Sequence, residues 1–113
     1  MAKYKTTATF DRRAKRLDPT QKDEFREACV ALSDEIDANG FNFRSGGPLD
    51  LHTYTGFVSP PTVWSMDWGK GNDHRAIFTV EDDLIVWHFV GTHADIKRWQ
   101  HEIGGKGLQV RSP

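Results

Sequence analysis

The feature that most constrains the fold is the segment Asp73 to His93, DHRAIFTVEDDLIVWHFVGTH, which predicts two strands joined by an acidic turn. Leu84–Val90 is apolar on both of its alternating sides, which is typical of a strand in the middle of a sheet. The segment also carries two side chains suited to chemistry on a phosphate, Arg75 near the start of the first strand and His93 just past the end of the second. The function of the chain depends on whether the fold holds these two groups on one face.

The length of 113 residues is most simply one domain, which we expect to span residues 1–103, with residues 104–113 as a flexible C-terminal tail. Seven Phe and four Trp supply much apolar area in few positions, and Cys29 is expected to be a buried thiol on the apolar side of a helix. No apolar run approaches ~18 residues, and no apolar stretch follows the Lys-rich N-terminus, so we expect a soluble, cytoplasmic protein.

The first part of the chain predicts a strand followed by two helices. Tyr4–Phe10 alternates and is rich in Thr and aromatic residues, and Asp11 is suited to cap a short helix after it. Asp18-Pro19 predicts the start of a second helix, which Asn39-Gly40 ends. The apolar residues of the second helix form one stripe: Phe25, Ala28, Cys29, Leu32 and Ile36.

The rest of the chain predicts strands and one more helix. Glycines and prolines interrupt residues 40–61, where a short strand is expected near Leu49–Tyr54. Thr62–Trp68 alternates as a strand does, with Asp67 on the side opposite its tryptophans. A short final helix is indicated by the spacing of Ile96, Trp99 and Ile103.

Alternation predicts that three polar residues share one face of the sheet. If the apolar rows are stacked, Asp67 comes opposite Arg75 across a turn at residues 69–73. A three-residue turn at Glu81–Asp83 then puts the odd-numbered positions of the last strand, and with them His93, on the same side. A one-residue bulge would undo this arrangement.

These three residue types suffice to cleave RNA without a metal or other cofactor. A base frees the ribose 2′-hydroxyl, the guanidinium holds the charged phosphorane, and an imidazole protonates the 5′ leaving oxygen. Asp67, or else Asp50, is the candidate base beside Arg75 and His93. The scattered His and Asp residues show no metal-ligand spacing, so no metal site is expected.

Each residue also has a structural alternative. Arg75 and Asp67 are equally consistent with a cross-strand ion pair, and His93 with a cap of the following helix. His88 lies within an apolar strand and is expected in the core, His74 is expected to face away from Arg75, and His52 and His101 have no evident partners.

A basic segment at the N-terminus suggests a surface for RNA, although a solvated pair of oppositely charged helices explains it equally well. Residues 1–17 carry six basic and one acidic side chain, whereas residues 18–38 carry two basic and seven acidic ones. The tryptophans are expected mostly in the core, with Trp64 or Trp68 able to stack on a base if exposed. The candidate RNA contacts are Arg12, Arg13, Lys15, Arg16, Lys70 and Trp68.

The segments FDRRAKRL, VWSMDW, HRAIFTV and VGTHADI, in this order over residues 4–99, resemble the RelE/ParE toxin superfamily. The resemblance implies an α+β fold, in which an N-terminal helical hairpin packs on a twisted, mainly antiparallel sheet. It also implies a type II toxin, usually a ribosome-dependent messenger RNA endonuclease, that is neutralised by a cognate antitoxin. Arg75 matches the phosphate-binding arginine of that family, and His93 matches the histidine found in several of its branches.

The chain departs from the family pattern in three respects. The segment from Gly46 to Trp68 contains no Glu or Lys, Ala94 stands where an aromatic residue is usual, and the net charge is −1 whereas ribosome-directed members tend to be basic. Three hypotheses remain: a ribosome-dependent messenger RNA endonuclease, a non-enzymatic ParE-type toxin of DNA gyrase, and a catalytically inactive protein-binding member of the fold.

Overall fold

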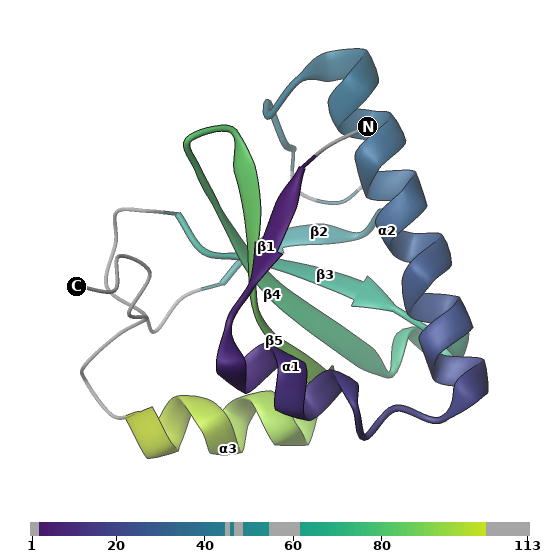
Figure 1. The fold of residues 1–113 in the computed structure, drawn as a ribbon, viewed down its shortest axis with the longest axis vertical. Coiled ribbons are helices and arrows are strands. Elements are labelled where there is room, and N and C mark those ends of the chain that lie inside the picture. The colour runs from purple at the N-terminus through teal and green to yellow at the C-terminus, as the bar shows by residue number, and fades with distance from the viewer. Residues whose placement is uncertain (1–2, 45, 47–48, 55–61, 104–113) are drawn as a thin grey trace.

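The computed structural model describes residues 3–44, 46, 49–54 and 62–103, and the predicted C-terminal tail at 104–113 lies outside them. Five strands form one sheet in the order β1-β5-β4-β3-β2, in which β1 is parallel to β5 and the other neighbours are antiparallel (Figure 1). The predicted α+β class is thus confirmed. The elements in chain order are β1 (Tyr4–Thr6), α1 (Ala8–Ala14), α2 (Pro19–Asn39), β2 (Leu51–Thr53), β3 (Trp64–Trp68), η1 (Lys70–Asn72), β4 (His74–Glu81), β5 (Leu84–Thr92) and α3 (His93–Ile103).

The first strand is shorter than its sequence pattern predicts. It ends at Thr6, because the side chain of Thr7 accepts a hydrogen bond from the backbone N–H of Phe10 and so begins α1. The expected strand up to Phe10 and the expected cap at Asp11 are therefore wrong, and Asp11 lies inside the first turn of the helix. The alternating, Thr-rich sequence around Thr7 is typical of a strand. The hydrogen bond that makes Thr7 a helix cap cannot be predicted from that pattern.

The second helix matches its prediction. Asp18 and Gln21 form a reciprocal capping box, and Gly40 follows the last turn with a φ of 71°. Leu32 and Ile36 are buried against the sheet, and the other three residues of the stripe pack against the same core. Cys29 is half-buried rather than fully buried, and desolvation raises the pKa of its thiol to about 12.

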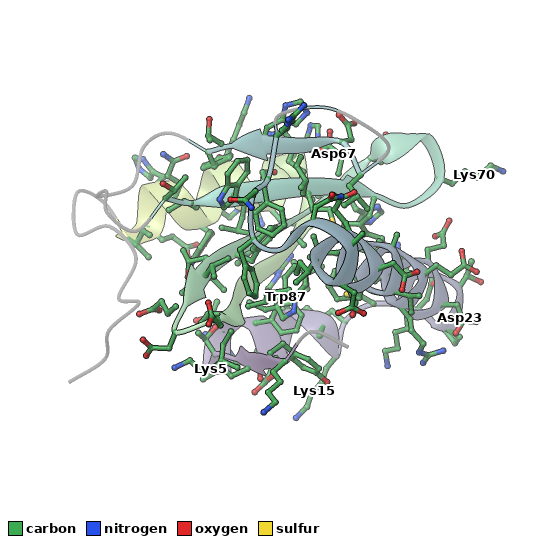
Figure 2. The ribbon with its side chains drawn as sticks, turned by 90° about the horizontal axis from the view of Figure 1, so that it is seen from above. Lys5, Lys15, Asp23, Asp67, Lys70 and Trp87 are labelled. Atoms are coloured by element: carbon green, nitrogen blue, oxygen red, sulfur yellow. The ribbon has the colours of Figure 1, made fainter. Side chains whose placement is uncertain are left out.

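The two faces of the sheet carry different layers. One face is covered by α1 and α2 and holds the larger apolar core, which includes Phe10, Leu32, Met66, Phe78 and Trp87. In Figure 2, Trp87 points into this interior. On the other face, α3 packs over a smaller apolar cluster made of Val63, Ile77, Phe89 and Ile96. The larger core anchors the fold, and part of the second face remains available to polar residues.

The connection between β4 and β5 differs from its prediction in two ways. Glu81 pairs with Leu84 across a two-residue turn, in which Asp82 and Asp83 adopt φ values of 52° and 61°, so the expected three-residue turn is wrong. The register also shifts by one residue, because Ile77 pairs with Phe89 whereas Phe78 pairs with Trp87. The bulge reverses the parity change caused by the shorter turn, so odd positions of the two strands pair again near Arg75.

Of the remaining sequence predictions, the strand near Leu49–Tyr54 is confirmed as β2 and the strand within Thr62–Trp68 as β3. The final helix is confirmed as α3, which ends at Ile103 as the last described residue. Among the described residues, no helix is both long enough and apolar enough to span a bilayer.

Candidate active site

The three predicted catalytic residues meet at one end of the sheet. Asp67 on β3 pairs directly with Arg75 on β4, and their Oδ1 and Nε atoms are 3.0 Å apart. Arg75 Nε donates a hydrogen bond of 2.7 Å to His93 Nε2, which itself lies 4.0 Å from Asp67 Oδ1. The side chains of Arg75 and His93 are 29% and 46% exposed, so a ligand in solution can reach both of them.

His93 is positioned by a capping box at the start of α3. Thr92 Oγ1 accepts from the backbone N–H of Asp95, and Asp95 Oδ2 accepts from the backbone N–H of Thr92. Thr92 is therefore the capping residue, and the alternative in which His93 caps the helix is wrong. As the first residue of α3, His93 leaves its imidazole free to meet Arg75.

A second layer of contacts fixes this helix end. Arg13 on α1 forms an ion pair of 2.7 Å with Asp95 and lies 5.0 Å above the ring of Phe89. Gly91, which pairs with Arg75, lies directly beneath the ion pair. A Cβ added there would come within 3.0 Å of Asp95 Oδ2 and 3.1 Å of Arg13, so only glycine fits without displacing the pair.

A second polar pair, formed by the alternative candidate base Asp50 and by His52, for which the sequence indicated no partner, lies beside Asp67. His52 Nε2 is 2.9 Å from Asp50 Oδ1 and 3.9 Å from Asp67 Oδ2. The pairing of β2 with β3 brings these groups together, because Leu51 lies opposite Met66 and His52 opposite Ser65. His52 lies in the three-residue strand β2 and Asp50 directly precedes that strand, whose register the sequence does not determine.

Asp67 has the most unusual electrostatic environment in the site. Its side chain is only 10% exposed, and this burial is the main cause that raises the pKa of its carboxyl group. The neighbouring carboxyl of Asp50 raises this pKa further, while Arg75 and His52 lower it. Oδ1 is buried and accepts no hydrogen bond, since the Nε–H of Arg75 is directed at His93 instead.

The bond from Arg75 also occupies the Nε2 atom of His93. In this bond Nε2 is the acceptor, because a guanidinium can only donate. A phosphate that draws the guanidinium toward itself would release Nε2 for proton transfer. The arrangement can thus bind an anion and exchange a proton beside it.

The candidate RNA contacts fall into two groups. Arg12, Lys15, Arg16 and Lys70 are exposed, and Figure 2 shows Lys15 and Lys70 pointing outward from different sides of the molecule. Trp68, in contrast, is 2% exposed and packs against the rings of Phe25 and His74, so its assignment as a base-stacking residue is wrong.

Arg13 is largely occupied by Asp95 but contributes to a groove between α1 and α3 with a volume of about 400 Å³. Phe89 and Trp99, which stack at 4.6 Å, form an aromatic wall of this groove. Its basic residues are Arg12, Arg13, Arg16 and Arg98. The groove also contains the acidic residues Asp95 and Glu102, and it runs along α3, the helix that begins at His93.

The other histidines are consistent with their predicted positions. His88 is 4% exposed, forms a hydrogen bond of 2.9 Å with Thr79 Oγ1, and has its pKa lowered to about 4, mainly by burial and secondarily by Lys5. His74 lies on the other face of the sheet from Arg75, where its ring packs at a tilt against Trp68 and contacts Gln21.

The sequence matches no protein-family model and no curated protein. The structure is similar to a chain of the RelB–RelE antitoxin–toxin complex from Methanococcus jannaschii, with a TM-score of 0.53 and 17% identity over 83% of this chain and 95% of that one. It is also similar to a chain of the E. coli DinJ–YafQ complex (TM-score 0.54, 16% identity, 85% and 98% covered) and to E. coli YafQ (TM-score 0.52, 13% identity, 85% and 98% covered). At these identities the similarity establishes the fold, which is the one that the sequence resemblance implied.

Proposed function

We propose that this protein is the toxin of a type II toxin–antitoxin pair and that it cleaves messenger RNA on the ribosome. The observation that carries the proposal is the contact between Arg75 and His93 beside the buried carboxylate of Asp67, on a face that solvent reaches. The fold shared with RelE and YafQ supports it. The proposed toxin unit spans residues 1–103.

In the proposed reaction, Arg75 binds the scissile phosphate and stabilises the charge that develops on its oxygens. A base removes the proton of the ribose 2′-hydroxyl, whose oxygen attacks the phosphorus. Asp67 takes this role directly, or His52 takes it while Asp50 orients the ring at 2.9 Å. The 2′-oxygen–phosphorus bond forms as the bond to the 5′-oxygen breaks, which leaves a 2′,3′-cyclic phosphate.

His93 is proposed to protonate the departing 5′-oxygen. In the free protein its Nε2 accepts the bond from Arg75. When the phosphate engages the guanidinium, Nε2 is free to bind a proton and to deliver it to the leaving group. The donor and the phosphate-binding group would then act from adjacent positions on the same ligand.

The affinity for RNA is proposed to come from the exposed basic residues rather than from the overall charge of −1. The groove between α1 and α3 offers cationic groups and an aromatic wall close to the helix that begins at His93. Arg12, Lys15, Arg16 and Lys70 are the proposed contacts to ribosomal or messenger RNA.

A cognate antitoxin is the proposed protein partner. The solved complexes of similar structures are described as RelB–RelE and DinJ–YafQ. By the same reasoning, an antitoxin of this chain would lay a helix or strand over the proposed active face or over the N-terminal helices. Co-purification of the protein encoded beside it would identify this partner.

Induced expression in cells tests the proposal. Expression of the wild-type protein is expected to arrest growth, and the double variant Arg75→Ala, His93→Ala is expected to restore it. Arg26→Ala is the matched control, because it removes an exposed arginine on α2 whose guanidinium lies 2.9 Å from Asp23. Arrest that survives the double substitution would contradict the endonuclease and favour DNA gyrase or another target.

A further inference from the structure

We propose that Asp50, His52 and Asp67 form a binding site for one divalent transition-metal ion of the Zn²⁺ type. Each of the three residues offers one ligand atom, and these atoms lie within 4.8 Å of one another. Two of the separations are 2.9 Å, from His52 Nε2 to Asp50 Oδ1, and 3.9 Å, from the same nitrogen to Asp67 Oδ2.

These separations suit a small, tetrahedral ion. Zn²⁺ binds imidazole nitrogen and carboxylate oxygen at about 2.0–2.2 Å, which places two ligands of a tetrahedron roughly 3.3 Å apart. The observed pair of distances brackets this value. Small side-chain adjustments are therefore enough to enclose an ion, and a water molecule would take the fourth position.

The burial of Asp67 is an independent reason to expect a cation here. The carboxylate is nine-tenths buried, and its two oxygens face different groups. Arg75 approaches this carboxylate only at Oδ1, at 3.0 Å, whereas Oδ2 is directed toward His52. A second carboxylate, that of Asp50, lies on the same side. When two carboxylates lie side by side and one of them is buried, their charges repel and water cannot solvate both. A cation bound between them offsets this unfavourable free energy.

The backbone holds the three ligands in place. Asp50 adopts a φ of 50°, and its carbonyl accepts a hydrogen bond of 3.3 Å from the backbone N–H of Asp67. His52 is fixed opposite Ser65 in the pairing of β2 with β3. A site built on paired strands loses little freedom when an ion binds, which favours affinity.

The donor set selects the class of metal. One imidazole and two carboxylates suit Zn²⁺ and its neighbours, whereas Mg²⁺ prefers six oxygen ligands in an octahedron. Zn²⁺ would also occupy the lone pair of His52 and the carboxylate of Asp67. If the proposed function holds, the bound ion inhibits RNA cleavage, because it removes both candidate bases while Arg75 and His93 stay in place.

Calorimetric titration of the purified, chelator-treated full chain with Zn²⁺ tests the binding without any need for activity. We expect one ion per chain, and a loss of affinity of at least tenfold in His52→Gln and in Asp50→Asn. His101→Gln, at an exposed position on α3, and Cys29→Ala are expected to bind as the wild type does. Mg²⁺ is expected to give no saturable binding at the same concentrations.

Absence of saturable Zn²⁺ binding would overturn the proposal, as would binding that survives both His52→Gln and Asp50→Asn or that is lost in Cys29→Ala. Circular dichroism of each variant establishes that it is folded, and the exposure of His52 makes its replacement mild. A protein that binds Zn²⁺ but does not cleave RNA would refute the proposed function alone. Cleavage by a protein that does not bind Zn²⁺ would refute this inference alone.

Discussion

The two faces of the sheet use the same strands for opposite purposes. On β3, Met66 and Trp68 are buried under α2, whereas Ser65 and Asp67 alternate with them toward the other face. On β4, Phe78 belongs to the larger core, and Arg75 lies on the side of the polar cluster. Successive residues of a strand point to opposite faces of the sheet. The same short strands therefore supply both the apolar core and the polar groups of the candidate site.

The face under α1 and α2 stabilises the fold, and the opposite face carries the polar groups of the candidate site. The face beneath α1 and α2 is closely packed with aromatic rings, among them Phe10, Phe25, Phe78 and Trp87. The opposite face mixes a small apolar cluster with the partly exposed Arg75 and His93. Substitutions on the two faces are therefore expected to change different observables.

The largest effect is expected from the loss of Arg75. Arg75→Ala should lower the rate of RNA cleavage about 10²- to 10³-fold, because the charge on the phosphorane loses its preorganised partner. The midpoint of thermal unfolding should also fall, because Asp67, whose side chain is 10% exposed, would lose the cation that lies 3.0 Å from its Oδ1. The rate at which Arg26→Ala cleaves the same RNA is the reference. Equal rates for the two variants would contradict the assignment of RNA cleavage to the face that carries Arg75.

On the apolar face, Leu32→Ala should reduce the free energy of unfolding by roughly 2–5 kcal/mol, because it leaves a cavity between α2 and the sheet. Val30→Ala on the exposed side of the same helix is the control, with an expected change within about 0.5 kcal/mol. Urea denaturation measures both. A similar cost at the two positions would mean that α2 does not pack as described.

His88 should make stability depend on pH. Its folded-state pKa is lowered from 6.5 to about 4, so below pH 6.5 the unfolded chain binds a proton that the folded chain does not. Stability should therefore fall by roughly 3 kcal/mol between pH 6.5 and pH 4 through this residue.

The comparison of wild type with His88→Gln isolates that contribution, because Gln retains a partner for Thr79 Oγ1 without titrating. The difference in unfolding free energy between the two proteins should change across this pH range. His101→Gln, at an exposed position, should follow the wild type. Parallel pH profiles for wild type and His88→Gln would refute the buried neutral imidazole.

The smallest effect concerns the helix end that positions His93. Asp95→Ala removes both the acceptor for the backbone N–H of Thr92 in the capping box and the partner of Arg13, so the unfolding free energy should fall by about 0.5–2 kcal/mol. Cleavage should fall as well, because the imidazole is held by that turn. His101→Ala, at an exposed position on α3 outside the groove, should change neither quantity. Unchanged cleavage by Asp95→Ala would mean that the helix end does not set the position of His93.

The sequence was most informative where periodicity is long and regular. The apolar stripe predicted α2, and the alternation of β3 and β4 predicted that Asp67 lies opposite Arg75. Alternation assigns a residue to a side of a sheet but not to the layer above it, so the burial of Trp68 under α2 was missed. The position of His93 was right although two steps toward it were wrong, since the shorter turn and the bulge cancel.

The contribution of His52 could not be predicted. Its strand is three residues long and lies in a segment rich in Gly and Pro, where neither propensity nor periodicity determines a register. Thr7 illustrates the same limitation, because a single hydrogen bond to the N–H of Phe10 decides where strand becomes helix. Strand register depends on long-range pairing, and the start of a helix depends on a single capping bond. Neither can be predicted from a short segment of sequence.

The most direct test of the account is the chemistry of the RNA ends produced on purified translating ribosomes. Attack by the 2′-hydroxyl predicts fragments with a 5′-hydroxyl and a 2′,3′-cyclic phosphate, made by the wild type and lost with Arg75→Ala and with His93→Gln. The absence of cleavage, fragments that carry a 5′-phosphate, or cleavage that persists in both variants would contradict the assignment of this face to RNA cleavage.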